Sequence, residues 1–329
     1  MTPNIPMENL VTVDEQYLND LAERLRDVSP GDTYEPFRDV DETFWLWANT
    51  TGYRDSTELQ AILPDLPSLD MQLRFTGKSG DDTLAEGHSL AAELKVQYEI
   101  HRGPLTPDTR ILEFGCGWGR IIRFFLKDVR PDNLWGIDCN EELVSFCKQS
   151  NPGCNFERND PLPPTDLADQ SFDLIYAYSL FTHLSEPAHL GWLAELRRLL
   201  APGGLLVVTV RPRHFISYCG KLTNDTELSH ESQASLVGMF ADTESALRDY
   251  DAGRFCYEPY RSSSYGDDWG EACISRPYVE RRWADRFELL GFIEDLTRFK
   301  QHLVVLRSTT QAVHVDQNDP IRWRRFQST

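Results

Sequence analysis

The chain has 329 residues, of which 40% are hydrophobic and 11% aromatic, enough for one large α/β domain with additions or for two domains. Its formal net charge of −19 argues against general binding to nucleic acid or anionic membranes, because so acidic a surface repels phosphate. The seven cysteines include no CxxC pair, so we expect reduced thiols and no metal site. The N-terminus does not resemble a signal peptide, and no apolar run approaches about 18 residues, so we expect a soluble, cytoplasmic protein.

The N-terminal region, residues 1–89, is predicted to form a helical cap on the main domain. Apolar residues recur at helical spacing over residues 14–28. The stretch that follows contains Phe37, Phe44, Trp45 and Trp47, and is too aromatic for a disordered leader.

Residues 90–212 alternate between strand and helix patterns and are predicted to form the core. The predicted elements are a helix over 89–103, a strand over 109–114, a helix over 120–129, a strand over 134–138, a helix over 140–150, strands over 154–159 and 172–180, a helix over 189–200 and a strand over 205–210. This alternation predicts a parallel sheet with helices on both faces.

The rhythm stops over residues 213–275, which are polar and aromatic and are predicted to be an insertion. Residues 276–307 return to the core with a helix over 278–292 and strands over 293–296 and 302–307. These two strands are joined too tightly for a crossover helix, so we expect them to pair antiparallel. Residues 308–329 are predicted to be a peripheral tail.

The sequence LEFGCGWGR, from Leu112 to Arg120, places three glycines between a strand and a predicted helix. Glycines let the backbone turn sharply and approach a ligand closely. The dinucleotide fingerprint GxGxxG would need its third glycine at Arg120, which argues against an NAD-dependent oxidoreductase. The loop reads instead E-x-G-x-G-x-G from Glu113 to Gly119.

This loop resembles that of the class I S-adenosylmethionine-dependent methyltransferases, and four further segments agree in order and spacing. They are LWGID ending at Asp138, NDPLPP, FDLIYAYSLFTHLSE and LLAPGGLLVVTV. The resemblance covers residues 90–307 apart from the insertion. It implies an α/β fold with a seven-stranded, Rossmann-like, mostly parallel sheet whose last strand is antiparallel, helices on both faces, the N-terminal cap and a substrate lid formed by residues 213–275.

The resemblance also implies S-adenosylmethionine as the cofactor. The glycines would pass beside its methionine part, Glu113 would face its ammonium, Asp138 would accept both ribose hydroxyls and Arg120 would reach its carboxylate. Taken alone, Asp138 could instead cap the following helix, and Arg120 could be a surface arginine. The full set of expected cofactor-binding residues is Glu113, Gly115, Cys116, Gly117, Gly119, Arg120, Asp138, Cys139, Asp160, Tyr178 and Ser179.

Methyl transfer to a hydroxyl or ammonium also requires a group that removes a proton. His183 and His214 are the candidate catalytic bases, because each follows a strand at the edge of the sheet where ligands bind. A purely structural role for His183 remains an alternative. In the insertion, Tyr265, Asp268 and Trp269 are the expected substrate-binding residues, with a solvated acidic loop as the alternative. RFTG, Arg74 to Gly77, is expected to close over the cofactor from the cap side.

These observations predict a methyltransferase that acts on an oxygen or nitrogen of a small polar metabolite, a sugar or a natural-product intermediate. A protein or peptide methyltransferase is the enzymatic alternative, and a non-catalytic module that binds the cofactor or a partner is the alternative from another class. We expect no nucleic-acid or membrane partner and leave a homodimer open.

Overall fold

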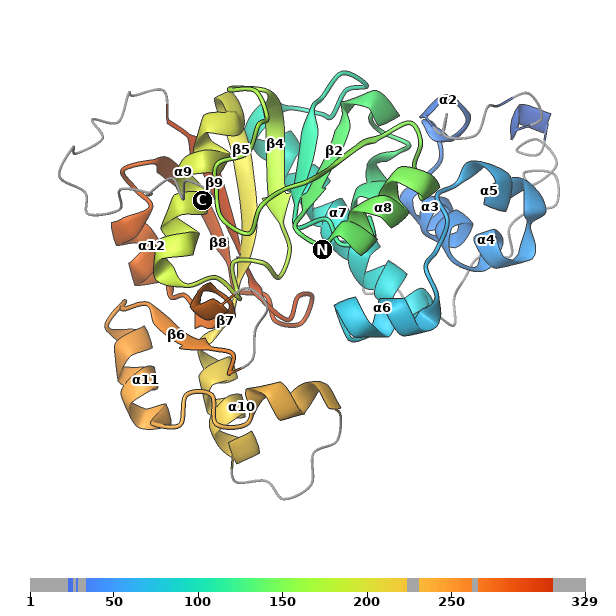
Figure 1. Ribbon diagram of the computed structural model, residues 1–329. Coiled ribbons are helices and arrows are strands. Elements are labelled where there is room, and N and C mark those ends of the chain that lie inside the picture. Colours follow the sequence, from blue (N-terminus) through green and yellow to red (C-terminus); the bar gives the residue numbers. More distant parts are fainter. Residues whose placement is uncertain (1–22, 26–27, 29–33, 224–230, 262–265, 310–329) are drawn as a thin grey trace, which may run out of the picture.

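The computed structural model describes residues 23–25, 28, 34–223, 231–261 and 266–309 (Figure 1). Most of the helix predicted over 14–28, most of the tail and Tyr265 therefore lie outside the described residues. Within the described ranges, no helix is both long enough and apolar enough to cross a membrane.

The described N-terminal part is helical, as expected for residues 34–89. Asp41, Ser56 and Ser68 begin three of its helices, because each side chain accepts a hydrogen bond from a backbone N–H of the first turn. The last helix runs across residue 90, so the proposed boundary between cap and core falls within one element. The helices are α2 Tyr34–Phe37, α3 Glu42–Asn49, α4 Thr51–Asp55, α5 Thr57–Ile62, α6 Leu69–Thr76 and α7 Asp81–Arg102.

The core is a seven-stranded sheet in the order β3-β2-β1-β4-β5-β9-β8. β1 to β5 run parallel, and β9 is antiparallel to both β5 and β8. This arrangement confirms the predicted fold class. The strands are β1 Ile111–Phe114, β2 Leu134–Asp138, β3 Asn155–Arg158, β4 Phe172–Ala177, β5 Leu200–Val210, β8 Phe287–Ile293 and β9 His302–Ser308.

Helices cover both faces of this sheet (Figure 1). Alternate residues of β1 enter opposite apolar cores: Ile111 belongs to the core shared with the N-terminal helices, and Leu112 to the core shared with the C-terminal ones. The other helical segments that line the sheet are η2 Ile122–Phe125, η3 Pro131–Asn133, α8 Glu141–Ser150, α9 Glu186–Leu199 and α12 Arg276–Arg282.

The insertion lies beyond the end of the sheet at which β5 runs into α10 (Figure 1). We call this end, where the parallel strands finish, the carboxyl edge. The described insertion has a small apolar cluster of its own that includes Ile216 and Phe240. Its elements are α10 Arg213–Thr223, η4 Glu231–Leu236, α11 Thr243–Asp251, η5 Gly266–Asp268 and a hairpin of β6 Cys256–Pro259 and β7 Gly270–Cys273.

The helix predicted over 120–129 is wrong, because only residues 122–125 form a short 3-10 turn. Its backbone hydrogen bonds run from residue i to i−3, from Phe124 to Ile121 at 3.0 Å and from Leu126 to Arg123 at 3.3 Å. The backbone N–H of Ile122 donates to the Glu113 carboxylate at 3.1 Å, and the carbonyl of Phe124 accepts from the Trp45 indole at 3.1 Å. The Phe124 carbonyl thus has a partner outside the segment, whereas the Ile122 N–H lies in the first turn, where an α-helix leaves N–H groups without a ladder partner.

The predicted helix over 278–292 and strand over 293–296 are also wrong in their limits. α12 ends at Arg282, and β8 begins at Phe287 and ends at Ile293. Phe287 to Ile293 pair with β9, so sheet pairing overrides the helical spacing of the apolar residues.

Substitution of two glycines in strands, Gly136 and Gly291, would test how closely the core packs around the loop after β1. A Cβ at Gly136 would lie 2.7 Å from the Phe156 ring and 2.9 Å from the Cβ of Cys116, whereas a Cβ at Gly291 would meet Val305 at an ordinary 3.7 Å. Gly136→Ala should lower the free energy of unfolding by about 1–3 kcal/mol through overpacking. The matched change Gly291→Ala should leave it unchanged or raise it slightly. Equal denaturation midpoints for the two variants would contradict this packing.

Candidate active site

The loop after β1 is held in a conformation that favours glycine. Gly115, Gly117 and Gly119 have φ angles of 76°, 54° and 78°. The backbone N–H groups of Gly115 and Cys116 both donate to the carbonyl of Ile137, at 2.8 and 3.1 Å. A Cβ added at Gly117 would meet no atom within 4 Å, so the backbone here faces open space. We call this loop, residues 115–119, the cradle. It lies at the carboxyl edge, and its backbone is open at Gly117.

Asp138 fixes this cradle from the end of β2. One carboxylate oxygen accepts the N–H of Gly117 at 2.9 Å, and the other accepts the N–H of Asn140 at 2.9 Å. Burial raises the pKa of Asp138, while the N–H groups of Asn140 and Gly117 oppose that rise. The helix cap of α8 is Asn140, which accepts from Leu143, so the alternative that Asp138 is the cap is wrong.

Glu113 lies buried beneath the cradle, with 2% of its surface exposed. One carboxylate oxygen accepts both the N–H of Ile122 at 3.1 Å and the hydroxyl of Tyr176 at 3.0 Å. Burial raises the pKa of Glu113 to about 8 despite these hydrogen bonds. The side chain is therefore mostly protonated at neutral pH.

Arg120 is buried rather than on the surface, so the surface alternative is wrong. Its guanidinium donates to Glu86 of α7 at 2.8 Å and to the carbonyl of Thr83 at 3.1 Å. The guanidinium carbon also lies 5.4 Å from the ring centroid of Tyr178. Arg120 thus joins the N-terminal helices to the carboxyl edge, while its predicted contact with a cofactor carboxylate stays a prediction.

The other expected cofactor residues occupy different environments. Cys116 is buried in the loop, Cys139 is half-buried after β2, and Asp160 is exposed after β3. Ser179 follows β4 with a φ of 57°, which is unusual for a residue with a side chain. Its hydroxyl accepts a hydrogen bond at 2.8 Å from Gln301, a buried residue that the sequence analysis missed.

The RFTG segment lies beside the expected cofactor site. Arg74 forms an ion pair with Glu142 at 2.7 Å, in the first turn of α8. The hydroxyl of Thr76 lies 3.0 Å from that of Thr83, the residue that also binds Arg120. Closure of this segment over a cofactor stays a prediction.

His183 lies at the carboxyl edge, in the segment that follows β4, where it meets the insertion. The segment 182–185 runs antiparallel to residues 268–272, with backbone hydrogen bonds of 2.8 Å from Gly270 to His183 and from Ala272 to Thr182. The Nδ1 atom of His183 lies 2.9 Å from the carbonyl oxygen of Gly270. Because a carbonyl oxygen can only accept, Nδ1 carries the proton and the neutral ring keeps its lone pair on Nε2.

The imidazole of His183 stacks on Trp269, with centroids 4.9 Å apart and the ring planes 25° from parallel. Burial lowers the pKa of His183, and although Glu271 opposes this change, the ring is neutral at pH 7. Asp268 is half-buried and accepts hydrogen bonds from the hydroxyl and the N–H of Ser185. Asp268 and Trp269 are thus tied to the segment that carries His183 rather than placed in a solvated loop, and their contact with a substrate stays a prediction.

The remaining candidate base, His214, is exposed on α10. Burial lowers the pKa of His302, and the nearby His214 lowers it further, so His214 lies close to His302. The structure therefore does not bring His214 into the group around His183, and a catalytic role for it stays a prediction.

The site contains three buried or half-buried residues that the sequence analysis did not select. The carboxylate of Glu271 in β7 accepts hydrogen bonds from the guanidinium of Arg211 on both oxygens, at 2.8 and 3.2 Å. It also accepts one from the hydroxyl of Tyr260. Arg211 directly follows β5. This position at the carboxyl end of a strand is the feature of the sequence that could have identified it as a site residue. Tyr260 and Glu271 belong to the insertion, where no motif spacing marked them.

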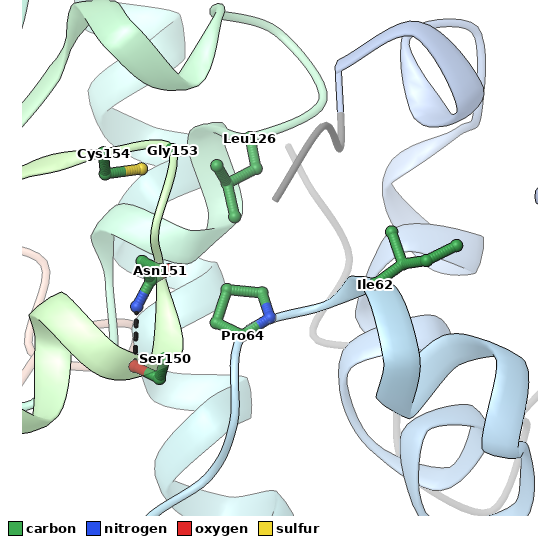
Figure 2. Close-up of a pocket in the computed structure, with 7 residues that line it drawn as sticks. All are labelled: Ile62, Pro64, Leu126, Ser150, Asn151, Gly153 and Cys154. Atoms are coloured by element: carbon green, nitrogen blue, oxygen red, sulfur yellow. Dashed lines mark hydrogen bonds between the residues drawn. The ribbon is translucent and has the colours of Figure 1, made fainter. Parts of the chain in front are cut away.

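A small pocket outside this site lies between the N-terminal helices and the loop that precedes β3 (Figure 2). It lies near the edge of the sheet opposite the glycine loop, because α8 runs from the end of β2 back toward the beginning of β3. Its lining residues are Ile62, Pro64, Leu126, Ser150, Asn151, Gly153 and Cys154.

Comparisons with known proteins select the same part of the chain. A family model described as a methyltransferase domain matches residues 111–204. Phthiotriol/phenolphthiotriol dimycocerosates methyltransferase 1 of Mycobacterium ulcerans is 28% identical over 159 residues, which are 46% of this chain and 52% of that protein. Trans-aconitate 2-methyltransferase of Sinorhizobium medicae is 33% identical over 105 residues, 31% of this chain and 38% of that protein.

A solved methyltransferase structure from Methanosarcina mazei aligns with 63% of this chain and 95% of its own, at 19% identity and a TM-score of 0.41. The chain spans about half of the length of the Mycobacterium relative and less of the Sinorhizobium one. The matched residues 111–204 include the glycine loop, Asp138 and most of the parallel strands. Residues 111–204 therefore form a methyltransferase domain, and the order of the strands agrees with the resemblance to the class I S-adenosylmethionine-dependent methyltransferases.

Proposed function

We propose that the protein transfers a methyl group from S-adenosylmethionine to an oxygen or nitrogen atom of a small polar molecule. The observation that carries this proposal is the cradle at the carboxyl edge, where Gly117 faces open space and donates its N–H to Asp138. Relatives whose names specify phthiotriol dimycocerosates and trans-aconitate support an acceptor of small-molecule type.

The residues around the cradle fit the polar groups of this cofactor. Asp138 is only half-buried, and each of its oxygens keeps a lone pair beyond the N–H that it already accepts, so it can receive the two ribose hydroxyls. Glu113 offers a buried carboxyl group for the ammonium of the methionine part. The bound cofactor supplies an electrophilic methyl group on a sulfonium, and the protein chiefly positions the acceptor in line with it.

The acceptor is proposed to be neutral or cationic at the reacting end. The guanidinium groups of Arg120 and Arg211, which flank Tyr178, already bind the carboxylates of Glu86 and Glu271. Because these carboxylates already neutralise both guanidinium groups, neither arginine offers an unpaired positive charge to an acidic acceptor.

His183 is proposed as the base that removes the acceptor's proton. Its Nδ1–H is fixed by the carbonyl of Gly270, so Nε2 holds the lone pair that accepts a proton. A Cβ built on Gly115 would lie 2.9 Å from a methyl carbon of Leu180, three residues before His183, so this segment packs against the glycine loop.

The cofactor assignment is tested by replacing Asp138. Asp138→Ala should weaken binding of S-adenosylhomocysteine by about 100-fold or more in calorimetry, because each hydrogen bond to a charged group contributes about 1.5–3 kcal/mol. The control Asp132→Ala removes an exposed aspartate just before β2 and should bind normally. Near-native affinity of the folded Asp138→Ala protein would refute the ribose assignment.

Glu113 gives a test that needs no methyl acceptor. Because its raised pKa of about 8 keeps it protonated at pH 7, ionisation against the cofactor's ammonium should release up to about one proton on binding. Calorimetry in buffers of different ionisation enthalpy measures this release. Glu113→Gln should abolish it, and an equal release from both proteins would rule out Glu113 as the ammonium partner.

The role of His183 is tested by turnover. A labelled methyl donor incubated with a metabolite extract identifies an acceptor, with which His183→Gln should lower kcat by about 10²–10⁴-fold, the range for a general base. Glutamine can still donate to Gly270, so affinity for S-adenosylhomocysteine should change little. His88→Gln, which alters a histidine bound to Glu42, serves as the control. Unchanged turnover would leave His183 a structural role.

A further inference from the structure

Glu271 lies closer to the imidazole of His183 than any other carboxylate described around it. Its Oε1 atom is 3.7 Å from Nδ1 of His183, and its side chain is 2% exposed. The two residues come from different parts of the chain: His183 follows β4, and Glu271 is in the hairpin of the insertion. The pair therefore forms only when the insertion is docked on the carboxyl edge.

The position of this carboxylate is fixed by its other partners. Arg211 binds both oxygens through Nε at 2.8 Å and Nη2 at 3.2 Å, and its guanidinium carbon lies 4.0 Å from the ring centroid of Phe215. The hydroxyl of Tyr260 donates to Oε1 and lies 3.4 Å from Nδ1 of His183. A buried carboxylate held by three donors has one orientation, and that orientation faces the imidazole.

Three elements present charged or titratable groups to His183: Glu271 from β7, Arg211 from the end of β5 and Tyr260 from the residue after β6. Burial lowers the pKa of His183, Glu271 raises it and Arg211 lowers it. The pKa of Tyr260 is raised by its burial and by Glu271, so this side chain stays neutral. Among these groups, Glu271 alone stabilises a positive imidazole.

We infer that Glu271 is a positioning residue, held by Arg211 and Tyr260, that stabilises the protonated imidazole of His183 during methyl transfer. The inference rests on the proposed function of His183. The acceptor's proton moves to Nε2, Nδ1 keeps its own proton on the Gly270 carbonyl, and the single positive charge of the imidazolium lies beside the carboxylate. The proton then leaves to water, which restores the neutral ring.

The inference is tested in the full chain by an NMR titration of His183, with no acceptor present. Glu271→Gln removes the carboxylate and leaves Arg211 unpaired, so the titration midpoint of His183 should fall by about one unit or more. Glu244→Gln makes the same change of charge at an exposed position of the same insertion and should leave the midpoint unchanged. With an acceptor in hand, the acidic limb of kcat/KM should move to lower pH by the same amount in Glu271→Gln alone.

An unchanged or raised midpoint in folded Glu271→Gln protein would overturn the inference. If that variant fails to fold, Arg211→Met combined with Glu271→Gln removes both buried charges at once, and the midpoint should again fall, by a smaller amount. Binding of S-adenosylhomocysteine to the same samples reports on the proposed function separately. A fallen midpoint without cofactor binding would reject the function, and cofactor binding with an unmoved midpoint would reject the role of Glu271.

Discussion

The hydrogen bond from the Gly117 amide to the Asp138 carboxylate is the contact on which the rest of the site depends. It joins the loop after β1 to the end of β2, two strands already paired in parallel. Together with the bonds from Gly115 and Cys116 to Ile137, it holds three left-handed glycines in one arrangement. The carboxylate that shapes the loop is also the one proposed to receive the ribose, so folding and cofactor binding would share a single group.

Both additions to the core contribute in the same way. Each supplies a carboxylate to an arginine at the carboxyl edge: Glu86 of α7 binds Arg120, and Glu271 of the insertion binds Arg211. Tyr178 lies near both guanidinium groups. The cap and the insertion therefore neutralise cations at the carboxyl edge. Removing either partner of such a buried ion pair strongly destabilises the folded protein.

The sequence was sufficient for the fold class and for the cofactor loop, because both depend on local signals. Alternating patterns predicted the parallel strands, and the need for left-handed backbone is visible in the glycines at 115, 117 and 119. The helix predicted over 120–129 failed because the segment forms i to i−3 hydrogen bonds, and its contacts with Glu113 and Trp45 come from distant parts of the chain that local spacing does not reveal. Glu271, Tyr260 and Gln301 were missed for a related reason: their importance arises only from contacts across the fold, with Arg211, His183 and Ser179.

A structure of the protein with S-adenosylhomocysteine bound would test the central claim most directly. The account predicts the ribose hydroxyls on Asp138, the amino group toward Glu113, and the sulfur between the glycine loop and the segment that carries His183. A ligand held elsewhere, or a ribose that leaves Asp138 bonded only to Gly117 and Asn140, would contradict it.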